Sequence, residues 1–151
     1  MRGGARLLAT VALGLLALPA VAAPVRLTGE LRSETRGTTR ITLFGRSFIS
    51  FISANPTGTT SASGLVRCRP LTGHCFRRLG RFQLTLTSGE LRGALTFGAV
   101  QCSLTGQLFH QGCRAPCATR FQGDYVCVRE LPVVDQGIFG LRPLPDRLLA
   151  E

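Results

Sequence analysis

The sequence predicts a small all-β domain, an antiparallel β-sandwich or barrel of about seven or eight strands that is stabilised by disulfides. Three observations support this fold class: polar and apolar residues alternate at every second position, glycines separate the alternating runs, and six cysteines follow an apolar leader. No segment carries the apolar stripe of period 3.6 that an amphipathic helix requires.

The alternation is clearest in residues 90–97, where Leu91, Leu95 and Phe97 fall on one face and Arg92 falls on the other. Threonine, valine, isoleucine and phenylalanine fill such runs and pack well on a pleated surface. We expect strands near residues 25–32, 38–44, 46–53, 63–69, 81–87, 90–97, 99–109 and 124–130.

Turn residues separate the expected strands at spacings short enough for hairpins. The glycines that mark these turns are Gly37, Gly45, Gly89 and Gly98. Residues 53–64 are small and polar, which predicts an exposed mobile loop.

The N-terminal leader has the form of an export signal. A basic start precedes the apolar run 7–18, and residues 20–22 (Ala-Val-Ala) supply the small-x-small pattern that signal peptidase recognises. The run is short of the roughly 20 residues that a membrane-spanning helix needs. We therefore expect a signal peptide at 1–22, a single domain at 23–151, no transmembrane helix, and a secreted or periplasmic protein.

A transmembrane β-barrel is an alternative, because it also combines alternating strands with a signal peptide. The sequence argues against it. One tyrosine and no tryptophan cannot form the aromatic girdles of such barrels, and the chain ends in Leu-Leu-Ala-Glu instead of an aromatic strand end.

Six cysteines in an exported chain predict a framework of disulfides. One pair would bracket a short turn, a second would close a short loop, and a third would join neighbouring strands at core-facing positions. The expected pairs are, in that order, Cys68–Cys75, Cys113–Cys117 and Cys102–Cys127. Exchanges of partner among the last four cysteines are the alternatives.

A zinc site competes with part of this framework. His110, Cys113 and Cys117 have ligand-like spacing, and Cys127 would complete a set of four. Thiols in an oxidising compartment are normally paired before they can hold zinc. We therefore expect disulfides and no metal or cofactor.

The composition excludes several kinds of catalysis. All 18 basic residues are arginine, so a Schiff base, a Ser-Lys nucleophile and a phosphate-loop lysine are absent. The Gly-x-Ser-x-Gly elbow of hydrolases is also missing, and the eight carboxylates form no recognisable pair. An enzyme is therefore the least supported class of function.

The formal net charge is +10, carried entirely by arginine. A coding bias towards arginine explains this composition better than a surface selected for anions does, because the arginines are spread along the whole chain. One cluster stands out. Between residues 67 and 81 there is no acid and five arginines occur, with Phe76 among them and Phe82 directly after the last. These five are Arg67, Arg69, Arg77, Arg78 and Arg81.

Basic side chains near aromatic rings suit a polyanion, so we interpret this Arg-rich hairpin as an anion-binding site. An ordinary hairpin tip with solvated arginines is the competing interpretation.

The sequence thus predicts an exported, non-catalytic binding or structural protein. Its expected partner is an acidic glycan, lipopolysaccharide or another polyanion such as nucleic acid. The alternative is a secreted inhibitor that presents the stapled loop, with Leu71 or Phe76, to an enzyme.

Overall fold

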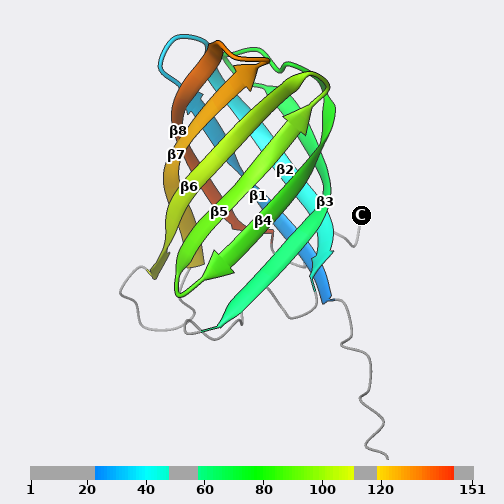
Figure 1. The fold of residues 1–151 in the computed structure, drawn as a ribbon, viewed down its shortest axis with the longest axis vertical. Coiled ribbons are helices and arrows are strands. Elements are labelled where there is room, and N and C mark those ends of the chain that lie inside the picture. Colours follow the sequence, from blue (N-terminus) through cyan, green and yellow to red (C-terminus); the bar gives the residue numbers. More distant parts are fainter. Residues whose placement is uncertain (1–22, 48–57, 111–118, 145–151) are drawn as a thin grey trace, which may run out of the picture.

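The computed structural model describes residues 23–47, 58–110 and 119–144 (Figure 1). The expected signal peptide at 1–22 and the expected Cys113–Cys117 disulfide lie outside the described residues, as does the 53–57 part of the expected mobile loop.

Eight antiparallel strands form a closed barrel in which each strand pairs with the next and the last pairs with the first (Figure 1). The all-β prediction is confirmed, as a barrel and not a sandwich. The strands are β1 (Ala23–Ser33), β2 (Gly37–Ser47), β3 (Thr59–Pro70), β4 (Leu79–Thr87), β5 (Glu90–Phe97), β6 (Val100–His110), β7 (Thr119–Arg129) and β8 (Val133–Pro143).

The break expected at Gly45 between strands 38–44 and 46–53 is wrong, because β2 runs without interruption from Gly37 to Ser47; residues 48–53 lie outside the described residues. Gly45 is not a turn residue. It lies within β2 opposite Gly64 of β3, where the two backbones approach closely and leave no room for a side chain. Residues 59–64, expected in the loop, form the start of β3.

The strand β8 was not predicted from the sequence. Its polar–apolar alternation is obscured, because glycine occupies the buried position 137 and the apolar Ile138 is exposed. An inward-facing apolar residue is therefore missing at one position, and an apolar residue stands at an outward one. Glycine in a strand usually marks a place where another backbone approaches closely. Here a Cβ on Gly137 would meet the backbone of Arg32 in β1.

The turn expected at Gly89 is present between β4 and β5. Ser88 and Gly89 have φ angles of 50° and 80°, and left-handed angles at both positions characterise the two-residue hairpin turn that matches strand twist.

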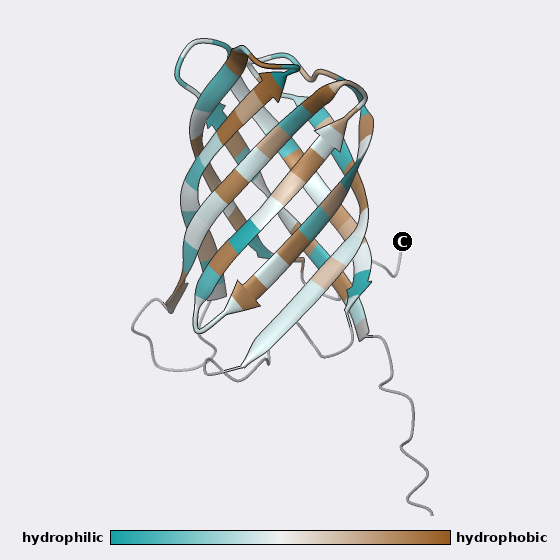
Figure 2. Cartoon of the chain, in the orientation of Figure 1, coloured by the Kyte–Doolittle hydropathy of each residue, from teal (hydrophilic) through white to brown (hydrophobic). Residues whose placement is uncertain are grey.

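Apolar side chains point into the barrel and polar side chains point out, so hydropathy alternates along each strand (Figure 2). The buried apolar residues form one cluster drawn from all eight strands. This orientation is the reverse of that in the membrane-barrel alternative, whose apolar residues face lipid.

Within the described ranges, no helix has the length and apolar character needed to cross a membrane.

Inward-facing glycines make room for phenylalanine rings in the barrel. Gly106 and Gly123 face each other across β6 and β7, and a Cβ on Gly106 would lie only 2.7 Å from Cζ of Phe139. Gly45 has the same relation to Phe82, again at 2.7 Å. Aromatic side chains commonly cover glycines of adjacent strands in this way, and such glycines let a sheet bend into a barrel.

We predict opposite effects of two alanine substitutions in this barrel. Gly106→Ala should destabilise by about 2 kcal/mol or more, because the new methyl group collides with the Phe139 ring in a core that cannot expand. Gly140→Ala, on the outer surface of β8, should be neutral or stabilise by about 0.5 kcal/mol, since nothing lies within 4 Å of its Cβ position. Urea unfolding of both variants measures the difference, and equal effects would show that the interior is not filled as described.

Candidate functional site

Two disulfides are present among the described residues, Cys68–Cys75 and Cys102–Cys127. They are two of the three pairs expected from the sequence, and they fit an oxidising compartment. Because Cys127 is bonded to Cys102, it is not free to act as the fourth ligand of the proposed zinc set. In the part of the chain that the structure describes, no three His, Cys, Asp or Glu residues are grouped to hold a metal ion.

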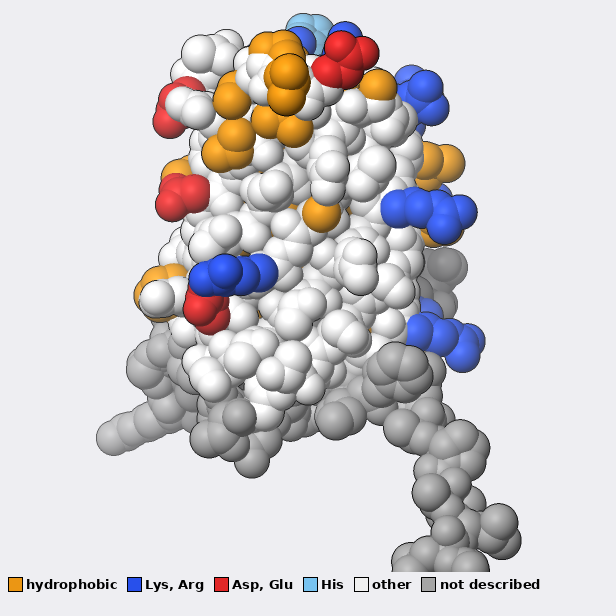
Figure 3. All heavy atoms as spheres, in the orientation of Figure 1, with side chains coloured by type: hydrophobic (Ala, Val, Ile, Leu, Met, Phe, Trp, Pro, Cys, Tyr) orange, Lys and Arg blue, Asp and Glu red, His pale blue; other side chains and the backbone are white. Residues whose placement is uncertain are grey.

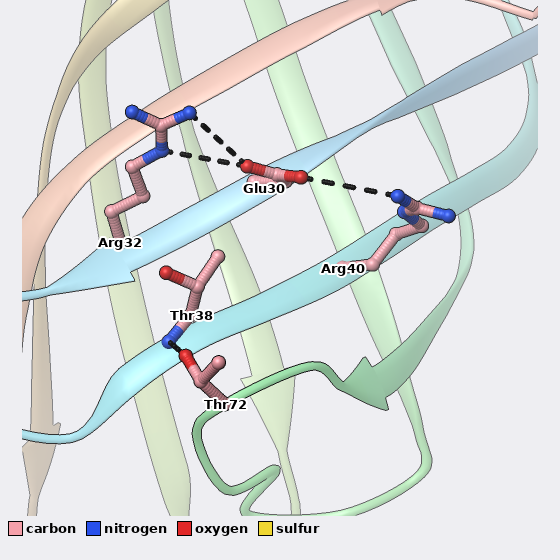
Figure 4. Close-up of polar contacts among 5 residues, drawn as sticks. All are labelled: Glu30, Arg32, Thr38, Arg40 and Thr72. Carbon is pink, nitrogen blue, oxygen red and sulfur yellow. Dashed lines mark hydrogen bonds and ion pairs between the residues drawn. The ribbon is translucent and has the colours of Figure 1, made fainter.

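Hydrogen bonds and a disulfide hold the connection between β3 and β4 against the end of the barrel. The carbonyl oxygen of Thr38 accepts hydrogen bonds from the N–H groups of Leu71, Thr72 and Gly73 at 3.0–3.1 Å. In return, the Thr38 N–H donates to Oγ1 of Thr72 at 3.0 Å (Figure 4). The Cys68–Cys75 disulfide then closes the same loop.

Phe76, in this loop, packs against the hydrophobic core, and the Arg36 guanidinium lies 4.7 Å from the centre of its ring. The ring is therefore half-buried. For the inhibitor alternative, the loop presents Leu71, which is exposed, but it does not project Phe76.

A small cavity lies at this end of the barrel, between Tyr125, Asp135, Ser33 and the two disulfides. The Tyr125 hydroxyl donates to Oδ2 of Asp135 at 3.0 Å, and the Ser33 hydroxyl donates to Oδ1 of the same carboxylate. The cavity volume is about 20 Å³, which suits roughly one water molecule and not a substrate. The cluster is thus a hydrogen-bonded closure of the barrel.

The environment of Tyr125 raises the pKa of its phenol well above the usual value. Burial is the main cause, because it disfavours the charged phenolate, and the neighbouring Asp135 carboxylate adds repulsion.

The five arginines predicted as an anion site are all exposed and lie on β3, on β4 and in the connection between these strands, where the Arg78 carbonyl oxygen accepts a hydrogen bond from the N–H of Cys68 at 2.8 Å. Arg67 and Arg69 point outward from β3 and Arg81 from β4. Arg77 lies at the end of the barrel, since a Cβ on Gly98 in the β5–β6 turn would be 2.6 Å from its Nε. None of the five forms an ion pair with a described residue.

The aromatic residues expected to accompany these arginines are not on the same surface. Phe82 is buried in the barrel interior, and Phe76 lies against the core. The exposed aromatic ring near the arginines belongs to Phe44, which stands opposite Leu65 on the outer face of β2 and β3. Sequence reasoning missed Phe44, although its position between the core residue Leu43 and Gly45 places it outward by alternation.

Charge is distributed unevenly around the barrel. Residues 23–47 and 58–88, which carry β1–β4, contain ten arginines and two carboxylates. Residues 89–110 and 119–144, which carry β5–β8, contain four of each. Figure 3 looks onto the face formed by β4–β7, where arginines are few and most blue side chains lie along the edge nearest β3.

We call the outward arginines of β1–β4 the basic face. They are Arg26, Arg32, Arg40, Arg46, Arg67, Arg69 and Arg81. Arg40 and Arg69 stand directly opposite each other across β2 and β3, an arrangement of like charges that costs stability. Among the described residues of these strands, Glu30 is the one outward carboxylate. The basic face can therefore attract anions.

Comparison of the chain with protein-family models, curated proteins and solved structures gives no match, so the function has to be argued from the chemistry of this surface.

We predict that Tyr125 resists deprotonation in the folded protein. It is the single tyrosine in a chain without tryptophan, so phenolate absorbance near 295 nm reports it alone. In denaturant the phenol should titrate near pH 10, whereas in the native protein it should titrate only at higher pH. Because the folded pKa is the higher one, its contribution to stability is complete below about pH 10 and is lost as the pH rises further. Reversible native titration near pH 10 would contradict the burial and the hydrogen bond to Asp135.

Proposed function

We propose that the protein is an exported binding protein that holds an acidic polymer on its basic face. The observation that supports this most directly is the excess of ten arginines over two carboxylates in β1–β4 and their connections, against a balance in the other half of the barrel. The partner is an acidic glycan, lipopolysaccharide or another polyanion, and the place of action is the periplasm or the extracellular space.

The spacing of the arginines suits a polymer with repeated charges. Outward residues recur about every 6.8 Å along a strand, and neighbouring strands lie about 4.8 Å apart. Arg67 and Arg69 are successive outward residues of β3. Arg40 of β2 is the cross-strand partner of Arg69, and Arg81 of β4 is the partner of Leu65, the outward residue that precedes Arg67. Each guanidinium can bind a carboxylate, sulfate or phosphate with two parallel hydrogen bonds.

An apolar surface adds to the charges. Phe44 and Leu65 are partners across β2 and β3, with exposed fractions of 39% and 55%. Arg26 and Arg81 are their outer neighbours in the same cross-strand row. This row therefore holds an apolar pair with a guanidinium group at each end, so the Phe44 ring can stack against a sugar or a base while the charges hold the polymer.

Among the residues that the structure describes, the interior of the barrel supplies no comparable site. It is filled by the apolar cluster, and the cavity beside Tyr125 has a volume of about 20 Å³, far below the 300–1,000 Å³ that is typical of small-ligand sites. Recognition is therefore assigned to the outer surface.

We predict that Arg67→Ala combined with Arg81→Ala weakens binding to heparin and to a single-stranded oligonucleotide. For the oligonucleotide, the slope of log K against log salt should fall by about 0.7 for each phosphate that is no longer neutralised, or roughly 1.4 in total. Arg92→Ala combined with Arg129→Ala removes the same charge from the balanced half of the barrel and is the matched control. Fluorescence titration at several salt concentrations measures both.

Equal weakening in the two double variants would show a diffuse field and overturn the basic face as a site. Binding by the native chain that is insensitive to salt would overturn the polyanion proposal itself and favour the inhibitor alternative.

A further inference from the structure

A groove of about 510 Å³ crosses the outer surface where β7, β8, β1 and β2 lie side by side. Gly140 forms part of its floor: no atom lies within 4 Å of where its Cβ would be, so the hollow exists because this outward position of β8 has no side chain. Gly140 is the cross-strand partner of Glu30 in β1 and of Gln122 in β7. The groove is thus open above the backbone, which a ligand can approach closely.

Four arginines and one carboxylate line the groove. Glu30 stands between two of them and forms ion pairs with Arg32 at 3.4 Å and Arg40 at 3.9 Å (Figure 4). Such exposed pairs contribute little to stability, but they hold the guanidinium groups in place. Arg120 and Arg142 also line the groove and form no ion pair with a described residue.

The remaining walls differ in chemistry. Ile138 contributes an apolar surface with an exposed fraction of 54%, whereas Thr28 and Gln122 contribute a hydroxyl and an amide. The groove therefore combines free cations, a carboxylate acceptor, neutral polar groups and an apolar patch.

We propose that this groove is a subsite for one anionic sugar residue of an acidic glycan, a proposal that rests on the proposed function. The sugar's carboxylate or sulfate would bind Arg120 and Arg142, its hydroxyls would donate to Glu30, and the C–H face of its ring would pack on Ile138. The volume falls within the range of small-ligand sites.

In this proposal the Glu30 carboxylate discriminates between phosphate chains and anionic sugars. A phosphate chain has acceptors but no donors for a carboxylate, so Glu30 would repel it, whereas a sugar carries hydroxyl donors beside its anionic group. The cross-strand row that contains Gly140 and Glu30 continues to Arg40 and Arg69 on the basic face. A glycan with one residue in the groove can therefore extend over β2 and β3.

The proposal is tested by filling the groove without changing charge. Gly140→Val places a β-branched side chain, which suits a strand, in open space. Ser103→Val, at an exposed position on the outer face of β6 away from both the groove and the basic face, also adds a β-branched side chain and is the control. The probes are a heparin-derived tetrasaccharide, inorganic tripolyphosphate and long-chain heparin, each measured by isothermal titration calorimetry with the full chain.

Gly140→Val should weaken tetrasaccharide binding about tenfold, equivalent to about 1.4 kcal/mol, while Ser103→Val leaves it unchanged. Glu30→Ala should strengthen tripolyphosphate binding and weaken tetrasaccharide binding. Unchanged tetrasaccharide affinity in Gly140→Val would overturn the subsite. Stronger binding of both short probes by Glu30→Ala would overturn the assignment to a sugar.

Long-chain heparin separates this subsite from the basic face. If heparin binding falls only with Arg67→Ala and Arg81→Ala and tetrasaccharide binding is insensitive to Gly140→Val, the basic face stands and the subsite fails. If Gly140→Val abolishes tetrasaccharide binding but the heparin affinity is unchanged by the Arg67 and Arg81 substitutions, the subsite stands and the basic face fails.

Discussion

Hydrogen bonding between β1 and β8 closes the barrel. Side chains that face its interior therefore form the core, and side chains that face outward contact the surroundings. The closed sheet has no open edge, so its inward-facing apolar residues share one interior, and the glycines beside Phe82 and Phe139 make room for these rings within it. Packing of the core consequently does not determine which residues occupy the outward positions. The charges at these positions need an explanation other than folding.

The outward arginines contribute little to that fold. The described ion pairs join exposed side chains and are individually weak, and Arg40 opposite Arg69 opposes folding slightly. An arginine-rich coding bias would enrich both halves of the barrel alike, but the carboxylates that balance the arginines are concentrated in β5–β8. A one-sided field of this kind guides an anionic partner to one face and weakens as salt is added.

Alternation was sufficient to predict β4 and β5, where Phe82, Leu84, Leu91 and Leu95 all point inward. It failed where glycine replaced an inward apolar residue, as at Gly137, because nothing in a single strand shows that its neighbour's backbone fills the space. The candidate site shows the same limit. Arg67 and Arg81 are close in sequence, so the sequence alone was enough to group them as candidates. The groove depends on cross-strand register between distant segments, so the sequence alone could not place Gly140 beside Glu30.

Backbone amide chemical-shift mapping during titration with a heparin-derived oligosaccharide tests most directly that recognition takes place on the outer surface of β8 and β1–β3. The largest shifts should fall on outward positions such as Gly140, Glu30, Arg40 and Arg69. The described core, including Leu84 and Leu104, should remain unperturbed. Shifts concentrated in the barrel interior, or on the balanced face around Arg92 and Ser103, would contradict this location of the binding surface.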